Sequence, residues 1–528
     1  MSFLTVQYLG FLGVLFLAYY ILGAIDKKVQ WILLLIASYI FYGFYSVKYM
    51  AFLIFSTLVT WGAAIGISEN YAREKAELKK DPSLTREQKK TIRSAFEKKR
   101  KCWILFAVVL DVGLLVLMKY ANYGIDSFNR LFGLNAPRLQ WVVLPLGFSF
   151  YTFQSLGYCI DVYRGSVEAQ RNLLKYALFV SFFPQLCEGP IGNYAELSPQ
   201  LLEGHRFEYD RFVKGLIRIL IGIFKKVVIA DRLALFIDPI YANYAWFSGS
   251  ALLLATCLYS FQLYADFSGY IDIALGTGEC LGIRLMENFS TPYFSHSITE
   301  FWRRWHISLG AWFRNYLYYP VLRSRAVSTF GKKLSKEGKK KLASALTATA
   351  GLVVTWTVIG MWHGAGLKYL LYGWYHGFFV ILAVWMGDAY KKAKETLHIR
   401  ENNAWKLFQI ARTFLIVTFG YVIFRADFSM EGVRAALGIY RRIFTAFYYK
   451  DAVYDFMLLT GGEWIVILFG VAAVFAFDVI ERKTPVADWI CGRKPVLRWA
   501  ILYVLLWITM LFFLDRPADA GNFIYFDF

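Results

Sequence analysis

Apolar runs long enough to cross a lipid bilayer recur along almost the whole chain. A membrane-spanning helix needs about 20 predominantly apolar residues. Of the 528 residues, 58% are hydrophobic, and the mean hydropathy is +0.42. The runs are Phe3–Ile25, Val29–Tyr45, Ala51–Ile67, Trp103–Tyr120, Trp141–Ile160, Phe212–Ile229, Ala251–Tyr270, Leu342–Met361, Tyr369–Met386, Phe408–Phe424, Trp464–Ile480 and Trp499–Phe513. They predict an all-α polytopic integral membrane protein with roughly 10–12 spans.

Two further apolar stretches, Leu173–Ile191 and Ile298–Tyr319, are interrupted by Pro, Gly or charged residues. Irregular backbone exists at membrane depth only where protein or water surrounds it. We therefore interpret both stretches as re-entrant or interfacial segments. The first apolar run has no basic region before it and no clear small-residue cleavage site, so we expect a retained span and not a cleaved signal.

The formal net charge of +20 is concentrated in loops between the apolar runs. The segment Tyr71–Lys101 carries twelve Lys and Arg against five Asp and Glu, and Arg323–Lys341 carries eight against one. A third basic segment is Lys391–Lys406. Because cytoplasmic loops carry an excess of basic residues, we expect all three to be cytoplasmic and the N-terminus to be outside. A nucleic-acid-binding protein would instead show a basic face on a soluble domain.

Four polar residues interrupt one predicted span. Gln262, Asp266, Ser268 and Asp272 lie in or just beyond it, and the first two are four residues apart, so they share a helix face. Two interpretations stay open, a buried network that positions helices or direct contact with substrate. Asp111 lies in the middle of another span without a charged neighbour in sequence, so it must pair elsewhere or be protonated.

The segment Phe301–Tyr316 is rich in aromatic and basic residues. Its spacing predicts a continuous helix with one apolar stripe. The stripe comprises Trp302, Trp305, His306, Leu309, Trp312, Phe313 and Tyr316, and it leaves Arg303, Arg304 and Arg314 away from its centre. A lone His on an apolar face is usually a packed core residue. The flanking aromatic residues and the pair of arginines favour a functional role for His306, and both roles stay open.

A glycine-rich break surrounds His363 in the segment Ile359–Gly366. Such glycines predict the end of a helix and a close approach of backbones. Because imidazole titrates near neutrality, we predict that His363 accepts a proton from a hydroxyl nucleophile. On one continuous helix His376 would face away from His363, so we favour a structural role for it. No HExxH motif or closely spaced cysteine pair occurs, so no metal site is predicted.

Short motifs follow one another in a fixed order over the second half of the chain and part of the first. They are Leu144–Tyr151, Ile160–Gly165, Phe182–Gln185 with Gly189-Pro190, Tyr264–Tyr270, Asn288–Tyr293, Phe301–Leu309, Tyr316–Pro320, Met361–Ala365, Val422–Ala426 and Phe523–Phe526. This set resembles the signature of the membrane-bound O-acyltransferase superfamily, from about residue 140 to the end.

The resemblance implies a ring of helices and re-entrant segments around a central funnel. It implies that His363 and His306 are the catalytic residues, with His363 near the narrow point and His306 nearer the cytoplasmic donor entrance. It also implies three parts: N-terminal transmembrane helices in residues 1–139 with a basic loop at 71–101, a catalytic core in 140–425, and C-terminal helices in 426–528. We expect further polar and aromatic residues to line the tunnel, namely Gln262, Asp266, Ser268, Asp272, Trp305 and Trp362.

Length and the C-terminal part look most like family members that serve O-acetylation of alginate and other bacterial polysaccharides. This resemblance implies a multi-pass protein of the bacterial plasma membrane that uses cytoplasmic acetyl-CoA and has no bound cofactor. It also implies an extracytoplasmic, esterase-like (SGNH-type) partner protein that passes the acetyl group to the polysaccharide. We expect donor phosphates to bind basic residues in or after the His306 segment, namely Arg303, Arg304, Arg323 and Arg325.

Two other functions remain to be considered. Family members that transfer D-alanine from a carrier protein to teichoic acid share the central motifs. A transporter with a polar site in mid-membrane is the second alternative. Transporters usually show paired half-sequences, and this chain has no visible internal repeat.

Overall fold

The computed structural model describes residues 3–426, 431–448, 455, 457–516 and 523–524. These residues form helices and connecting loops, with no β-strand among them. Internal packing divides the chain into two compact units. The first comprises Met1–Leu216 and Ala274–Met286, and the second comprises Ile217–Ile273 and Glu287–Phe528. The prediction of an all-α protein is confirmed, and the three predicted sequence parts stay a prediction.

The first unit contains eight complete helices and one short helical turn among its described residues. They are α1 (Val6–Ile25), η1 (Lys27–Val29), α2 (Gln30–Tyr45), α3 (Val47–Lys80), α4 (Arg86–Phe132), α5 (Phe148–Arg164), α6 (Leu173–Ser181), α7 (Phe183–Leu186) and α8 (Tyr194–Leu202). Helices α3 and α4 form a long hairpin whose free end carries the basic segment Tyr71–Lys101. Thr85 and Gln88 form a reciprocal capping box that starts α4 after the turn.

The second unit holds most of the later helices. They are η2 (Lys225–Ala230), α10 (Asp231–Ala242), η3 (Pro292–Phe294), α12 (Ile298–Arg304), α13 (Ile307–Phe313), η4 (Arg314–Tyr318), α14 (Tyr319–Arg323), α15 (Arg325–Lys336), α16 (Lys340–His363), α17 (Leu367–Thr396), α18 (Asn403–Arg425), α19 (Gly432–Thr445), α21 (Gly461–Glu481), α22 (Val486–Cys491) and α23 (Pro495–Leu514). The boundary between the units falls within α9 (Tyr209–Phe224) and α11 (Gly249–Cys280).

Nine helices of the described residues are long and apolar enough to cross a membrane. They coincide with nine of the predicted spans and lie on α1, α2, α3, α4, α16, α17, α18, α21 and α23. The other three predicted spans fall on α5, on α9 with η2, and on α11. These helices are rich in buried polar residues, which include Gln154, Lys226 and Asp266. With nine helices long and apolar enough to span a bilayer among its described residues, the chain is a multi-pass membrane protein.

The two weaker apolar stretches are broken into short helices. The first becomes α6 and α7, which are buried in their unit from Tyr176 to Leu186, whereas Leu174 is exposed. The second becomes α12, α13, η4 and α14. The prediction of one continuous helix from Phe301 to Tyr316 is therefore wrong. The chain leaves the helical path at Trp305 and resumes it after His306, which has a φ of +46°.

Asp111 finds its partner on a neighbouring helix. The hydroxyl of Ser56 on α3 donates a hydrogen bond of 2.9 Å to Oδ2 of Asp111 on α4. Ser56 Oγ also lies 3.2 Å from Ser155 Oγ of α5. Asp111 is completely buried, so this polar contact joins three helices where water has no access.

Helices α16 and α17 pack closely because glycines face the neighbouring backbone. A Cβ added at Gly373 of α17 would overlap the carbonyl oxygen of Trp356 on α16. A Cβ at Gly360 of α16 would lie 2.6 Å from the carbonyl oxygen of Tyr369. In a bilayer, where lipid and protein are equally apolar, such small residues let helix backbones approach and associate.

Replacing Gly373 with Ala is expected to destabilise this helix pair. The added methyl group forces α16 and α17 apart, and overpacking of this kind costs about 1–3 kcal/mol. Gly387→Ala on the same helix is the matched control, because a Cβ there meets nothing within 4 Å. Thermal unfolding of the purified protein in detergent should show a lower melting temperature for Gly373→Ala alone. Equal melting temperatures for the two variants would contradict the packing described here.

Candidate active site

One cavity of about 400 Å³ in the second unit contains both predicted histidines. Its walls come from α12, α13, η4, α16 and α17. The lining residues are Thr299, Trp302, Arg303, Trp305, His306, Leu309, Gly310, Phe313, Arg314, Tyr318, Leu352, Thr355, Trp356, Ile359, His363, Tyr372 and Val380. Most of this lining is apolar or aromatic, and it includes no carboxylate from the part of the chain that the structure describes. The cavity therefore combines an apolar lining with imidazole and guanidinium groups.

The chain break at His306 is produced by pairing with the segment that follows α11. Phe289 and Trp305 form an isolated antiparallel bridge. The backbone N–H of Ser290 donates to the carbonyl of Arg304, and the N–H of Ile307 donates to the carbonyl of Asn288, both at 3.0 Å. These bonds satisfy backbone groups that the interrupted helix leaves without helical partners. They hold His306 in a left-handed conformation that residues with a side chain rarely adopt.

Asn288 determines which nitrogen of His306 carries the proton. Oδ1 of Asn288 accepts hydrogen bonds from the backbone N–H and from the hydroxyl of Ser308, at 3.0 and 2.9 Å. That oxygen is therefore an acceptor, and Nδ1 of His306, 3.2 Å away, donates to it. Burial lowers the pKa of His306 to about 3, so the ring is neutral near pH 7. The remaining nitrogen, Nε2, is then the basic one.

His363 ends α16, as the surrounding glycines predict. Gly364 follows it in an extended conformation, and Gly366 has a φ of +137°, which favours glycine. The imidazole is 6% exposed and is surrounded by aromatic rings. The ring centroids of Trp362, Tyr372 and Phe424 lie 4.8, 5.4 and 5.2 Å from its own. This cage fixes the orientation of the ring at the cavity wall.

A buried lysine secures the turn that follows His363. Lys368, at 3% exposure, donates from Nζ to the carbonyls of Ala426 and Phe424, at 2.6 and 3.4 Å. These carbonyls belong to the C-terminal end of α18, where backbone acceptors lack helical partners. Lys368 therefore ties the start of α17 to the end of α18, next to Phe424, which contacts His363.

His376 lies on α17, near His363 but outside the cavity lining. The two residues are on different helices, and both contact the ring of Tyr372. His376 is completely buried and also contacts Trp302 at a centroid distance of 4.8 Å. Its predicted structural role stays a prediction.

Among the arginines predicted to bind the donor, Arg303 lines the cavity. Arg304 points elsewhere and donates to Glu300 at 2.6 Å. Arg323 and Arg325 flank the turn between α14 and α15 and do not line the cavity. Arg314 is an additional lining residue that the helical stripe placed away from the site. Both lining arginines are exposed, which places them at the opening of the cavity.

The predicted stripe agrees with the cavity lining in part. Trp302, Trp305, His306, Leu309 and Phe313 line the cavity, whereas Trp312 and Tyr316 do not. Arg314 is the first residue of the π-helical turn η4, and a π-turn changes the direction of the side chains that follow. No local sequence signal distinguishes this turn from ordinary helix.

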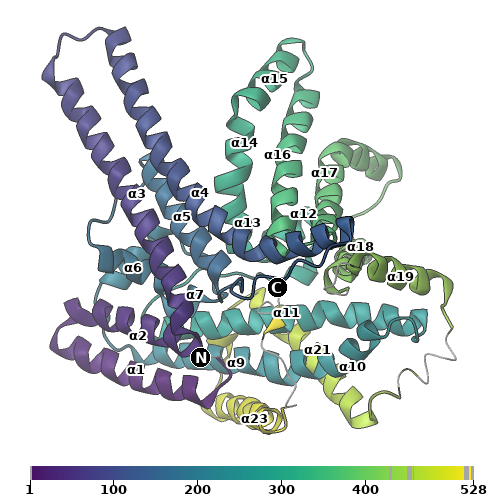
Figure 1. Ribbon diagram of the computed structural model, residues 1–528. Coiled ribbons are helices and arrows are strands. Elements are labelled where there is room, and N and C mark those ends of the chain that lie inside the picture. The colour runs from purple at the N-terminus through teal and green to yellow at the C-terminus, as the bar shows by residue number, and fades with distance from the viewer. Residues whose placement is uncertain (1–2, 427–430, 449–454, 456, 517–522, 525–528) are drawn as a thin grey trace. The chain divides into compact units, whose positions relative to one another are not determined.

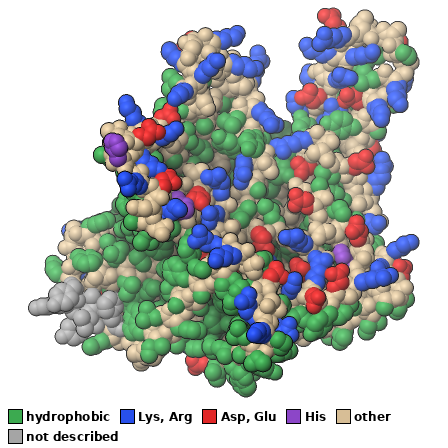
Figure 2. Space-filling view, turned by 180° about the vertical axis from the view of Figure 1, so that it is seen from behind, with side chains coloured by type: hydrophobic (Ala, Val, Ile, Leu, Met, Phe, Trp, Pro, Cys, Tyr) green, Lys and Arg blue, Asp and Glu red, His purple; other side chains and the backbone are tan. Residues whose placement is uncertain are grey.

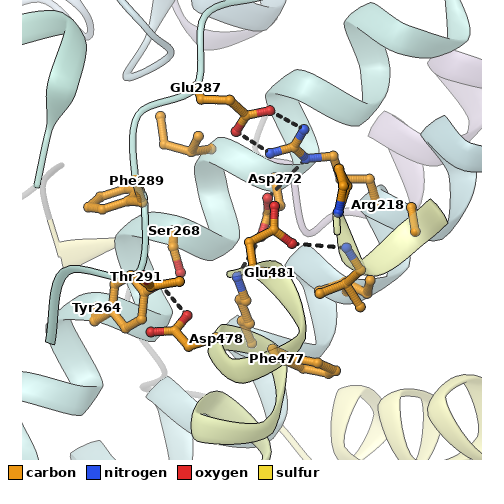
Figure 3. A pocket seen from close by; sticks show the side chains of 16 residues that line it. Arg218, Tyr264, Ser268, Asp272, Glu287, Phe289, Thr291, Phe477, Asp478 and Glu481 are labelled. Atoms are coloured by element: carbon orange, nitrogen blue, oxygen red, sulfur yellow. Dashed lines mark hydrogen bonds and ion pairs between the residues drawn. The ribbon is translucent and has the colours of Figure 1, made fainter. Parts of the chain in front are cut away.

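The predicted polar residues of α11 form ion-pair networks beside the histidine cavity and do not line it. Asp272 accepts from Arg218 at 3.0 Å and from Lys225 at 2.7 Å. Arg218 also donates to both carboxylate oxygens of Glu287 (Figure 3). These residues and Ser268 line a separate polar cavity of about 80 Å³. Bidentate pairing of this kind fixes α9, α11 and the segment after α11 relative to one another.

Asp266 belongs to a second network. It accepts from Lys226 at 2.5 Å and from the backbone N–H of Ile524 at 2.7 Å. Lys226 also pairs with Asp231, which in turn pairs with Arg516. The interpretation of Asp266 as part of a helix-positioning network is thus favoured for this residue. Of the terminal motif Phe523–Phe526, Tyr525 and Phe526 lie outside the described residues.

Of the remaining predicted tunnel residues, one lies on α11 and two lie in or beside the histidine cavity. Gln262 is buried on α11 away from the cavity lining. Trp305 lines the cavity. Trp362 lies between the histidines, with its ring centroid 6.1 Å from His306 and 4.8 Å from His363. The geometry thus gathers His306, His363 and Trp305 at one wall and leaves the α11 residues behind it.

The arrangement has the parts that proton-coupled group transfer requires. A neutral imidazole accepts a proton from a hydroxyl group, and an apolar wall limits competing attack by water. Guanidinium groups at the opening favour an anionic substrate. The described residues contain no cluster of three or more His, Cys, Asp or Glu able to hold a metal ion.

Comparison with known proteins shows to which family this chain belongs. The model of the membrane-bound O-acyltransferase family matches residues 168–424, which include both cavity histidines. A probable alginate O-acetylase AlgI of Pseudomonas putida is 37% identical over 439 residues, covering 82% of this chain and 78% of the relative. The chain belongs to the membrane-bound O-acyltransferase family. It is therefore an acyltransferase, and the resemblance of its motifs to that family is confirmed.

Other relatives within this family carry different names. A peptidoglycan O-acetyltransferase of Helicobacter pylori is 32% identical over 460 residues, covering 81% of this chain and 78% of the relative. A teichoic acid D-alanyltransferase of Bacillus subtilis is 30% identical over 291 residues, covering 53% of this chain and 68% of the relative. The relatives thus act on alginate, peptidoglycan or teichoic acid, as their names state.

The buried neutral state of His306 predicts a pH dependence of stability. Its pKa is lowered from 6.5 to about 3 by burial, so the unfolded chain binds a proton at higher pH than the folded one. Stability is therefore complete above about pH 6.5 and falls as the pH is lowered toward 3, by about 2 kcal/mol at pH 5. In His306→Gln this loss is absent. Thermal unfolding in detergent at pH 7.5 and pH 5 measures it, and parallel pH dependences of wild type and variant would contradict it.

Proposed function

We propose that this protein moves an acetyl group from cytoplasmic acetyl-CoA across the membrane, for O-acetylation of an extracytoplasmic polysaccharide. The observation that carries the proposal is one cavity lined by both His306, at the break between α12 and α13, and His363, at the end of α16, with apolar walls and two exposed arginines. The greater coverage by O-acetylating relatives supports acetyl over D-alanyl as the transferred group.

In the proposed reaction, His363 removes the proton from an acceptor hydroxyl. The hydroxyl oxygen attacks the thioester carbon, the new ester bond forms, and the carbon–sulfur bond breaks. The thiolate of CoA leaves and takes up a proton. In this proposal Nε2 of His306, the unprotonated nitrogen of a neutral ring whose Nδ1–H donates to Asn288, accepts a hydrogen bond from the donor group. The aromatic wall protects the thioester from hydrolysis.

The proposal includes an acceptor-side partner. Polysaccharide chains are too large for a cavity of about 400 Å³, so the acetyl group needs a carrier hydroxyl or a second protein outside the membrane. An extracytoplasmic, esterase-like acetyltransferase meets this requirement. D-alanyl transfer from a carrier protein is the second candidate, favoured by the teichoic acid relatives.

Replacing His363 with Gln is expected to abolish transfer while leaving the protein folded. Loss of a general base typically lowers the rate by about two to four orders of magnitude. Hydrolysis or transfer of radiolabelled acetyl-CoA by purified wild type and variant measures the effect, with melting temperature as the control for folding. Normal transfer by His363→Gln would exclude this residue as the base.

Charge reversal at the cavity opening is expected to weaken donor binding without removing the base. An arginine–phosphate contact contributes about 1.5–3 kcal/mol, so Arg303→Glu or Arg314→Glu should raise the KM for acetyl-CoA roughly tenfold or more. Arg400→Glu is the control, because this exposed arginine lies outside the cavity. If acetyl-CoA is inert and only an acyl carrier protein serves as donor, D-alanyl transfer replaces the proposed function.

A further inference from the structure

A second, open groove lies between α15 and the first half of α16. Its volume is about 580 Å³, and it is lined by basic, hydroxyl and small residues. They are Leu322, Ser328, Gly331, Lys332, Ser335, Lys336, Lys340, Ala343, Ser344 and Thr347. Three lysines thus line one groove, and none of the described residues that line it is acidic. Both helices belong to the second unit, so the groove is formed within one compact part.

Two lysines beside the groove form ion pairs with carboxylates, whereas Lys333 forms none among the described residues. Lys339 pairs with Glu337 at 3.3 Å and Lys341 pairs with Asp388 at 2.7 Å, and neither residue lines the groove. Within the described part of the chain, Lys332, Lys336 and Lys340 form no ion pair with a carboxylate. Positive charge without an internal counter-ion therefore remains in the groove, where it favours an anionic ligand.

The backbone adds to the positive potential at the same place. Lys340 is the first residue of α16, and no side chain caps the N–H groups of that first turn. The N-terminus of a helix of this length carries partial positive charge and unsatisfied donors. Gly331 allows α15 to lie against Thr347 of α16, since a Cβ there would be 2.9 Å from the threonine methyl group. Close packing of α15 against α16 keeps the lysine ammonium groups near the backbone N–H groups that begin α16.

The groove lies at the end of a candidate membrane span. Lys340–His363 is one of the helices long and apolar enough to cross a membrane, and the groove surrounds the N-terminal end of that span. Figure 2 shows Lys and Arg side chains gathered over the free end of the α15–α16 hairpin. Phe330, at 48% exposure on α15, adds an apolar group beside these cations. A basic helix with exposed aromatic side chains is suited to the interface between lipid and water.

We propose that this groove binds a phosphate group, held by Lys332, Lys336 and Lys340 and by the N–H groups that begin α16. Its position at the end of a span identifies the headgroup of an anionic phospholipid as the source that the geometry fits best. The phosphorylated end of a soluble nucleotide has the same chemistry and is the other source to be distinguished. The inference does not depend on the proposed acyl donor.

The test compares two probes on the full-length protein in detergent. The probes are short-chain phosphatidylglycerol, with phosphatidylcholine as its zwitterionic counterpart, and adenosine 3′,5′-bisphosphate. Affinity is measured by microscale thermophoresis at low and at physiological salt. Wild type is expected to bind phosphatidylglycerol more tightly than phosphatidylcholine, with an affinity that falls as salt rises.

The variant K332Q/K336Q/K340Q should lose at least about tenfold in affinity for the anionic probe, because each ammonium–phosphate contact is charge-assisted. The control K90Q/K98Q/K392Q removes the same charge at exposed lysines outside the groove and should bind like wild type. Unchanged melting temperatures without probe exclude misfolding. Binding of the bisphosphate alone, lost in the groove variant, supports a phosphate site with a soluble source.

Equal affinities of wild type and the groove variant for every probe would overturn the proposal. So would failure of wild type to discriminate between phosphatidylglycerol and phosphatidylcholine while also ignoring the bisphosphate. The lysines would then act as topology signals alone.

Discussion

Inside a bilayer every backbone N–H and C=O group needs a partner, because an unpaired one costs several kcal/mol. Both cavity histidines nevertheless lie where a helix is interrupted. The segment after α11 supplies the partners at His306, through backbone bonds to Arg304 and Ile307. Lys368 supplies them at the end of α18, beside the aromatic cage of His363. Pairing of broken backbone therefore makes it possible for an imidazole in a helix break and an imidazole at a helix end to line one cavity.

The charged residues of this protein occur in two arrangements, as ion pairs between helices and as exposed basic groups without nearby carboxylates. Behind the cavity, Asp266 is buried and paired with Lys226. Asp272 is partly exposed and paired with Arg218 and Lys225, so both carboxylates join helices. At the cavity opening and in the groove between α15 and α16, basic residues outnumber acidic ones. Buried pairs are costly to break and fix the arrangement of helices, whereas unbalanced exposed charge attracts anions.

How far the sequence predicts this structure depends on whether the deciding interaction is local. Runs of apolar residues locate nine spans, because length and hydropathy alone determine whether a helix can cross a bilayer. The glycines around His363 likewise predict the end of α16. By contrast, the break at His306 comes from Asn288, eighteen residues away, and the partner of Asp111 is fifty-five residues away. Periodicity contains no information about such tertiary pairing, so it predicts one continuous helix where the chain is interrupted at Trp305 and His306.

The proposed function requires the acetyl group to cross the membrane through the histidine cavity. Proteoliposomes can test this crossing, with radiolabelled acetyl-CoA on the side of the basic segment Arg323–Lys341 and a membrane-impermeant hydroxyl-bearing oligosaccharide, together with its extracytoplasmic acetyltransferase, on the other. We expect free CoA to stay on the donor side while labelled ester accumulates on the acceptor side, and His363→Gln to abolish both. Labelled ester that forms only when donor and acceptor share one side would rule out transfer across the membrane.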